Sequence, residues 1–152
     1  MDIDEFWKLM GRVDLAALEA GDEDEALSSV GSALAAMDVT RIAGFQEQLA
    51  QVLFAIDGES YVRNAGDSGT SDDGFLYVRC YVVARGERYY VRVKAKPENM
   101  PKSIDQWCES LLYVASNAWA ARTGGDPEDW EFEASVSYES GSNESLWGAT
   151  DA

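Results

Sequence analysis

Apolar side chains recur at helical spacing through residues 1–56. They stand three or four places apart, which puts them on one face of an α-helix. Gly21 favours a helix stop, and Asp22 and Asp38 favour helix starts. The pattern therefore predicts three amphipathic helices, joined by short links, that bury their apolar faces against one another. The apolar residues are Ile3, Phe6, Trp7, Met10, Val13 and Ala17, then Leu27, Val30, Leu34 and Met37, and finally Ile42, Phe45, Leu49, Val52, Leu53 and Ile56.

A second pattern, from Ser71 to Gly86, combines the start of a helix with an almost unbroken apolar run. Ser71 is a favoured N-cap, and Asp72 and Asp73 would lie in the first turn, where negative charge complements the helix dipole. The Tyr and Val residues after Phe75 favour a strand, whereas the cap and the length of the run favour a helix. In both interpretations we expect the segment to be buried.

Two further segments, residues 87–96 and 129–139, alternate between apolar and polar side chains. This period of two is typical of a β-strand. The polar face of the first segment is basic and that of the second is acidic, so pairing would bring opposite charges together. Between them, residues 103–123 show a helical stripe, and such a helix would be the crossover between parallel strands. The charged residues are Arg92, Lys94 and Lys96 on one face and Glu131 and Glu133 on the other.

These elements predict a mainly α fold, a compact multi-helix domain with a small two- or three-stranded β element from residues 87–96 and 129–139. We expect one acidic domain over residues 1–139 and a flexible acidic tail at 140–152, which is rich in Ser and Gly. Trp147 stands alone in that polar tail. The sequence leaves open whether it docks on its own domain, docks on a partner or stays loose.

Charge is distributed unevenly along the chain. The 152 residues carry a net charge of −16, with the excess acid near both ends. A field of this sign repels phosphate backbones, so we expect no binding to nucleic acid. It can attract a basic protein partner, or it can simply keep the protein in solution, which is the simpler interpretation.

The apolar runs are all shorter than the roughly 20 residues that a membrane span needs. The acidic stretch Met1–Glu5 does not resemble a secretion signal. The two cysteines, Cys80 and Cys108, lie in apolar runs and do not form the pattern of a disulfide framework. We therefore expect a cytoplasmic protein without membrane contacts, and the oligomeric state stays open.

Histidine is absent from the chain, and this excludes Ser-His-Asp triads, thiol–imidazole pairs and most zinc sites. The glycine-containing stretch at residues 66–69 lacks the lysine of a phosphate-binding P-loop. The sequence therefore predicts neither a cofactor nor a catalytic residue.

Candidate binding residues lie in and near the capped segment. The adjacent carboxylates of Asp72 and Asp73 can hold a hard cation if further oxygens converge, although first-turn charges of a helix are the simpler interpretation, and we expect no metal. Arg79 follows Asp72 by seven residues, on the same helical face. In an apolar run it needs a structural ion pair with another helix, or it binds an anion in a groove. Tyr77 and Trp107 complete the candidate set.

A family resemblance rests on Ser71-Asp72-Asp73-Gly74-Phe75, Tyr77, Arg79, Val82-Val83 and Gly86. This series resembles the signature S-D-D-G-F-x-Y-F-R-x-W-L-I-x-x-G of a bacterial family of unknown function. Phe6-Trp7-Lys8-Leu9 resembles the F-W-x-L opening of that family, and the similarity extends over residues 1–124. It departs where Tyr81 replaces a tryptophan and where residues 87–96 alternate. The resemblance implies a mainly helical fold and no established activity.

These observations favour a non-enzymatic protein-binding or regulatory module of the bacterial cytoplasm, because an acidic surface can steer the encounter with a basic partner. The alternative is a carboxylate-based or metal-dependent enzyme that uses Asp72, Asp73 and Arg79. A purely structural accessory unit is a third interpretation.

Overall fold

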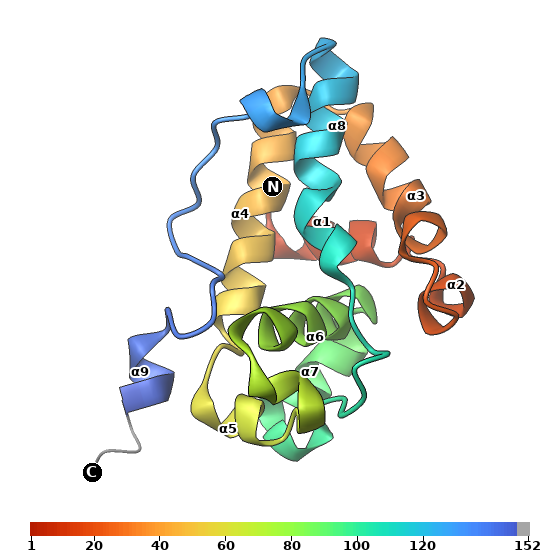
Figure 1. Ribbon diagram of the computed structural model, residues 1–152. Helices are drawn as coiled ribbons and strands as arrows, with labels where there is room; N and C mark the ends of the chain where they lie inside the picture. Colours follow the sequence, from red (N-terminus) through yellow and green to blue (C-terminus); the bar gives the residue numbers. More distant parts are fainter. Residues whose placement is uncertain (149–152) are drawn as a thin grey trace.

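Helices make up the regular structure of residues 1–148, the part of the chain that this computed structural model describes (Figure 1). The α-helices are α1 Ile3–Met10, α2 Leu15–Glu19, α3 Glu23–Ala35, α4 Val39–Phe54, α5 Glu59–Arg63, α6 Asp72–Ala84, α7 Glu87–Ala95, α8 Val114–Thr123 and α9 Glu144–Trp147. Short 3-10 helices are η1 Gly66–Thr70, η2 Pro97–Asn99, η3 Glu109–Tyr113 and η4 Pro127–Asp129. The mainly helical fold class is confirmed.

Aspartate caps begin the first four α-helices. In each, a carboxylate oxygen accepts a hydrogen bond from the backbone N–H three residues later, at 2.8–3.1 Å. The cap at Asp14 divides the apolar stripe of residues 3–17 between α1 and α2, which the sequence pattern merged into one helix. Part of the acidic excess is therefore structural, since each cap satisfies a donor that the helix leaves unpaired. The capping residues are Asp2, Asp14, Asp22 and Asp38.

The helices form two packed groups that share α4. In the upper part of Figure 1, α3 and α4 pack against α8, while α6 lies below them with α7 and η1 beside it. Nearly every side of α6 is buried, from Gly74 to Ala84 with Tyr77 half-buried. The hydroxyl of Ser71 accepts the Gly74 N–H at 3.0 Å, as the predicted cap requires. The run after Phe75 is therefore a buried helix and not a strand.

The strand predicted over residues 87–96 is wrong, because this segment is the helix α7. Tyr90 and Val93 stand three residues apart and both face the core, as helical spacing requires. The Tyr90 hydroxyl donates to the Val52 carbonyl at 2.7 Å, and its ring lies 5.1 Å from that of Trp7. These contacts from distant parts of the chain decide in favour of the helix.

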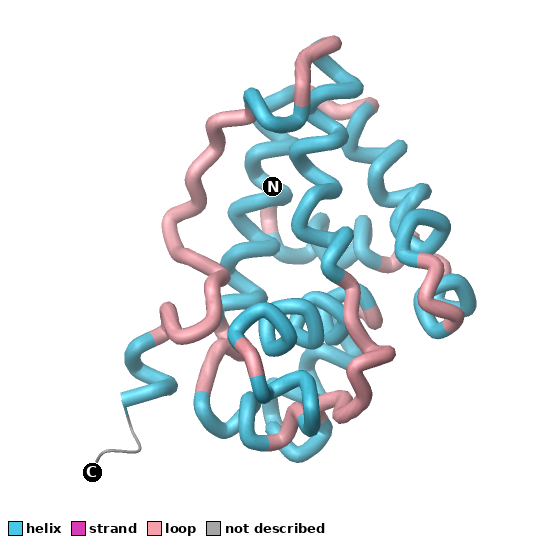
Figure 2. The backbone as a smooth tube through the Cα atoms, viewed as in Figure 1, coloured by secondary structure: helices cyan, strands magenta, loops and turns pink. Residues whose placement is uncertain are grey.

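The second predicted strand, residues 129–139, is also wrong, because residues 1–148 contain no strand with which it could pair. Residues 130–139 form a loop that runs beside α4 (Figure 2). Their side chains alternate between exposed and half-buried, which is what remains of the predicted pattern. Ser135 donates from its hydroxyl and its N–H to the Glu47 carboxylate, at 2.5 and 2.8 Å, and accepts from Gln51. Helix side chains thus hold the segment where the alternation predicted a β ladder.

The helix predicted over residues 103–123 begins later, at Val114, after a loop and η3. Within that loop, the Gln106 side chain accepts from the Ser103 N–H at 3.3 Å. Gly124 ends α8 in the left-handed region, at φ 78°. The prediction of a flexible tail stays a prediction. Its residues 149–152 lie outside the described residues.

Two glycines provide a test of this packing, because we expect substitutions at them to change the stability of the fold in opposite directions. A Cβ at Gly74 would lie 2.8 Å from the Ser68 carbonyl oxygen, whereas a Cβ at Gly31, in the middle of α3, meets nothing within 4 Å. We expect Gly74→Ala to destabilise the fold by about 1–3 kcal/mol through overpacking. We expect Gly31→Ala to stabilise it by about 0.5–1 kcal/mol through helix propensity. Urea unfolding measures both, and equal effects would contradict the packing of α6 against η1.

Candidate functional site

The carboxylates of Asp72 and Asp73 lie at the exposed start of α6. They are first-turn charges of a capped helix, which agrees with the interpretation that they complement the helix dipole. Within residues 1–148, no group of three or more His, Cys, Asp or Glu side chains is placed to hold a metal ion. Likewise, none of the described helices is long and apolar enough to cross a membrane.

Tyr77 and Trp107 form an edge-to-face pair on one side of α6, with ring centroids 5.5 Å apart. The indole N–H of Trp107 donates to the buried Ser68 hydroxyl at 2.8 Å. A hydrogen bond with Glu109 raises the pKa of Tyr77 to about 12, so the phenol stays neutral at physiological pH. The structure thus brings together two of the predicted binding residues. It adds Glu109 to them.

Arg79 is fully buried on another side of α6. Its guanidinium donates to the carbonyl oxygens of Leu53 and Tyr138, both at 2.9 Å, and to the Ser140 hydroxyl at 3.1 Å. The cation also lies over the Phe75 ring, 4.6 Å from its centroid. Among the described residues no carboxylate lies within ion-pair distance of it, so carbonyl dipoles and a ring face replace the expected ion pair.

Asp57 is a second buried charge, and the sequence did not predict its role. Its carboxylate accepts three hydrogen bonds of 3.0 Å, from the N–H groups of Gly141 and Asn143 and from the indole of Trp147. Burial lowers the pKa of Arg79, while the charge of Asp57 acts to raise it. Asp57 stands next to Gly58 in a stretch typical of a turn, and this local pattern gives no sign of a binding role.

The two charges hold one segment, residues 130–147, which we call the C-terminal strap. Ser140 makes a second contact with α6, because its hydroxyl, which accepts from Arg79, also donates to the Asp72 carbonyl at 2.7 Å. Asn143 donates its side-chain amide to the Phe54 carbonyl at 2.8 Å, and the Trp147 ring meets Phe75 edge to face at 6.1 Å. Trp147 therefore docks on its own domain. We call the surface formed by Asp57, Phe75 and Arg79 the strap cleft.

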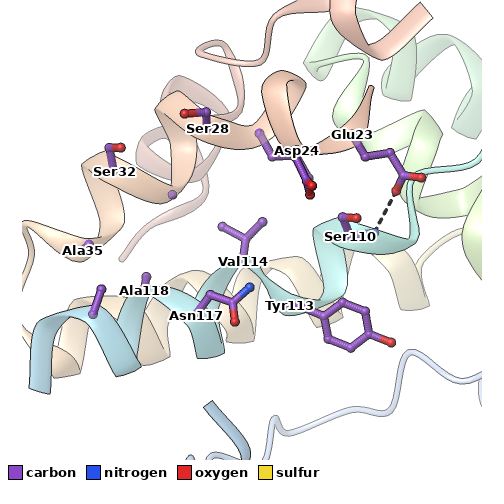
Figure 3. A pocket seen from close by; sticks show the side chains of 13 residues that line it. Glu23, Asp24, Ser28, Ser32, Ala35, Ser110, Tyr113, Val114, Asn117 and Ala118 are labelled. Atoms are coloured by element: carbon purple, nitrogen blue, oxygen red, sulfur yellow. Dashed lines mark hydrogen bonds between the residues drawn. The ribbon is translucent and has the colours of Figure 1, made fainter. Parts of the chain in front are cut away.

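A separate groove of about 520 Å³ runs between α3 and α8 (Figure 3). Small residues of α3 form one wall and apolar residues of α8 the other, while Glu23 and Asp24 lie at one end. Glu23 accepts the Ser110 N–H at 2.9 Å. None of the described lining residues is Lys or Arg. They are Glu23, Asp24, Leu27, Ser28, Gly31, Ser32, Ala35, Ser110, Tyr113, Val114, Asn117, Ala118 and Ala121.

The sequence did not predict the groove either. Its signal is the row of small residues at helical spacing in α3, namely Ser28, Gly31, Ser32 and Ala35. Such a row equally suits close helix packing, and α3 and α8 are in fact close neighbours. The pattern therefore indicates where two helices approach and does not reveal that the approach leaves a groove.

A family model described as "Protein of unknown function (DUF4240)" matches residues 1–121. The chain belongs to this family. The expected membership of a family of unknown function is confirmed, whereas the motif proposed for residues 71–86 stays a prediction. No curated protein and no solved structure matches the chain.

The DUF4240 match sets the two features of the surface apart. The groove lies wholly within it, and so do Asp57, Phe75 and Arg79 of the strap cleft. The C-terminal strap lies beyond residue 121. The cleft is thus formed by the family-matched part of the chain and filled by a segment outside the match.

Asp57→Asn tests whether the buried carboxylate holds the strap. The amide keeps the shape of the side chain but turns one acceptor into a donor that faces N–H groups, so at least one hydrogen bond is lost. We expect the free energy of unfolding to fall by about 2–3 kcal/mol, because each bond joins a donor to a buried charge. Urea unfolding measures this, with the exposed Asp67→Asn as control. Equal stability of the two variants would contradict the role of Asp57 in holding the strap.

Proposed function

We propose that this protein is a non-enzymatic protein-binding module that takes a basic, amphipathic segment of a partner into the groove between α3 and α8. One observation carries the proposal. The groove is open to solvent, has carboxylates at one end and has no Lys or Arg among its described lining residues. A concave surface that combines apolar side chains with convergent polar groups is the usual form of a binding site.

Charge and shape define the partner segment. The net charge of −16 favours the approach of a cationic molecule over long distances, and Asp24, which is exposed, can receive its Lys or Arg side chains. The walls offer methyl groups of Leu27, Val114 and Ala118 and the polar side chain of Asn117. An amphipathic helix with small apolar residues on one face and basic residues at one end satisfies both requirements.

The proposal sets this binding in the bacterial cytoplasm, a reducing compartment that suits the free thiols of Cys80 and Cys108. The alternative, an enzyme that uses Asp72, Asp73 and Arg79, receives less support from the geometry. Both aspartates are exposed to solvent, whereas the Arg79 guanidinium is enclosed by carbonyl oxygens and a hydroxyl.

Filling the groove tests the proposal. Gly31 lines it, and a Cβ there meets nothing within 4 Å beyond its own stretch of helix, so Gly31→Leu adds bulk to the wall of the groove. We expect a labelled cationic amphipathic peptide to bind the protein and to lose affinity by about ten-fold or more in this variant. Fluorescence anisotropy in low and physiological salt measures the affinity.

Ser29→Leu is the matched control, because Ser29 is exposed on the same helix and does not line the groove. It adds a similar apolar surface and should leave the affinity unchanged. The same peptide with its basic residues replaced by Glu should not bind. Equal affinities of the two variants, or no binding of the cationic peptide to the unmodified protein, would exclude the groove as the binding site.

A further inference from the structure

The contacts between the C-terminal strap and the strap cleft have the form of peptide recognition. Arg79 binds the backbone carbonyl of Tyr138, and Asp57 binds the backbone N–H groups of Gly141 and Asn143. Side chains add selectivity, because the Ser140 hydroxyl also reaches Arg79. Main-chain hydrogen bonds that supply affinity and a few side chains that supply specificity are the general pattern of peptide-binding sites.

A turn in the strap makes this recognition selective. Gly141 has a φ of 93°, a conformation that residues other than glycine rarely adopt. The turn directs the N–H groups of residues 141 and 143 to the two oxygens of a single carboxylate. Trp147 then brings its indole N–H to the same group. The contacts therefore involve a Ser-Gly-x-Asn turn that is followed, four residues after the Asn, by Trp.

The connection between the helical domain and residues 138–147 of the strap runs over the surface of the molecule. Residues 121–129 are exposed, and the contacts of Ser135 with Glu47 and Gln51 lie at the surface. If extended, the stretch 124–137 could span about 45 Å. That reach is comparable to the width of a small domain, so the strap can meet the cleft of a neighbouring molecule as well as its own.

We propose that the strap cleft is a peptide-binding site for the segment 138–147, and that copies of this chain exchange the segment so that one copy's strap fills the cleft of another. The hydrogen bonds are the same within one copy and between two. The balance between the two forms then follows from protein concentration, because the linker sets the effective concentration within one copy. The site is distinct from the groove between α3 and α8, and its test does not depend on that groove.

A cleaved full-length chain tests the binding site. A protease recognition sequence is inserted between Gly125 and Asp126, in the exposed stretch, and is cut after folding. The strap is then held by its contacts alone. We expect a fluorescently labelled peptide of residues 130–148 to replace it in a saturable manner, as followed by anisotropy. Failure of this peptide to bind would overturn the proposal.

Peptide variants test the contacts. Trp147→Phe keeps an aromatic ring against Phe75 but removes the N–H that Asp57 accepts, so affinity should fall on the order of ten-fold. Glu131→Gln, at an exposed strap position, is the matched control and should bind like the original peptide. Equal affinity of the Trp147→Phe and Glu131→Gln peptides would show that the cleft does not recognise the indole N–H of Trp147 as proposed.

Exchange between intact copies is tested by cross-linking. One copy carries Glu47→Cys and the other Ser135→Cys, two positions in contact when a strap is seated. The native thiols are buried, and burial raises the pKa of Cys108 to about 12, which keeps that thiol protonated and unreactive. After incubation at high concentration, a short bismaleimide should join the two copies, and a large excess of the unlabelled peptide of residues 130–148, which competes for the same contacts, should reduce the yield on the order of ten-fold. A yield that is insensitive to the competing peptide would refute exchange.

Discussion

Asp57 and Arg79 carry opposite charges at positions that water does not reach, and the path of the last part of the chain follows from this constraint. A charge removed from water is tolerated only when hydrogen bonds replace its hydration. The helices supply one such bond to Arg79, from the Leu53 carbonyl, and the strap supplies the others. The three N–H groups on Asp57 all belong to the strap. Docking of the strap therefore replaces much of the hydration that folding removes, while the Arg79 Nε–H is buried without a hydrogen-bond partner among the described residues.

The position of α6 creates this need. Helix α6 is buried on nearly every side, so an arginine in its middle cannot extend to the surface as it would from a solvent-facing helix. Phe75, one turn earlier, lies with its ring face next to the guanidinium and forms an edge-to-face pair with Trp147. The same side chain thus contacts the buried cation and the end of the strap. The groove lies elsewhere, between α3 and α8, and no strap residue lines it.

Local signals predict the parts of the fold that local interactions decide. The Ser71 cap and the helical stripes of residues 1–56 depend on neighbours within one or two turns, and the structure contains them, with the first stripe divided between α1 and α2. Residues 87–96 show the limit of such signals. Their alternating pattern fits a strand, but Tyr90 and Val93 also stand three residues apart, which fits one face of a helix. The contacts of Tyr90 with Trp7 and with the Val52 carbonyl favour the helix over the strand, and both partners lie far away in the sequence. Residues 130–139 alternate in sequence but form a loop that contacts α4 through Ser135, and not a strand.

In the candidate site, too, local sequence reveals some features, and contacts between distant residues determine the others. Arg79 could be recognised from sequence because a charge in an apolar run is conspicuous, but its partners are main-chain carbonyls, which carry no sequence signal. Asp57 follows an apolar residue at the end of a helix, in a context that fits an ordinary turn. Its role depends on residues more than eighty positions later. Pairings of this kind arise from tertiary structure alone.

Amide hydrogen exchange at Gly141 and Asn143 tests the central claim most directly, because both N–H groups donate to the buried Asp57 carboxylate. Exchange followed by NMR in the native state should show both amides protected relative to Glu133, which is exposed in the same strap. If Gly141 and Asn143 exchange as fast as Glu133, the buried charges do not hold the strap in place.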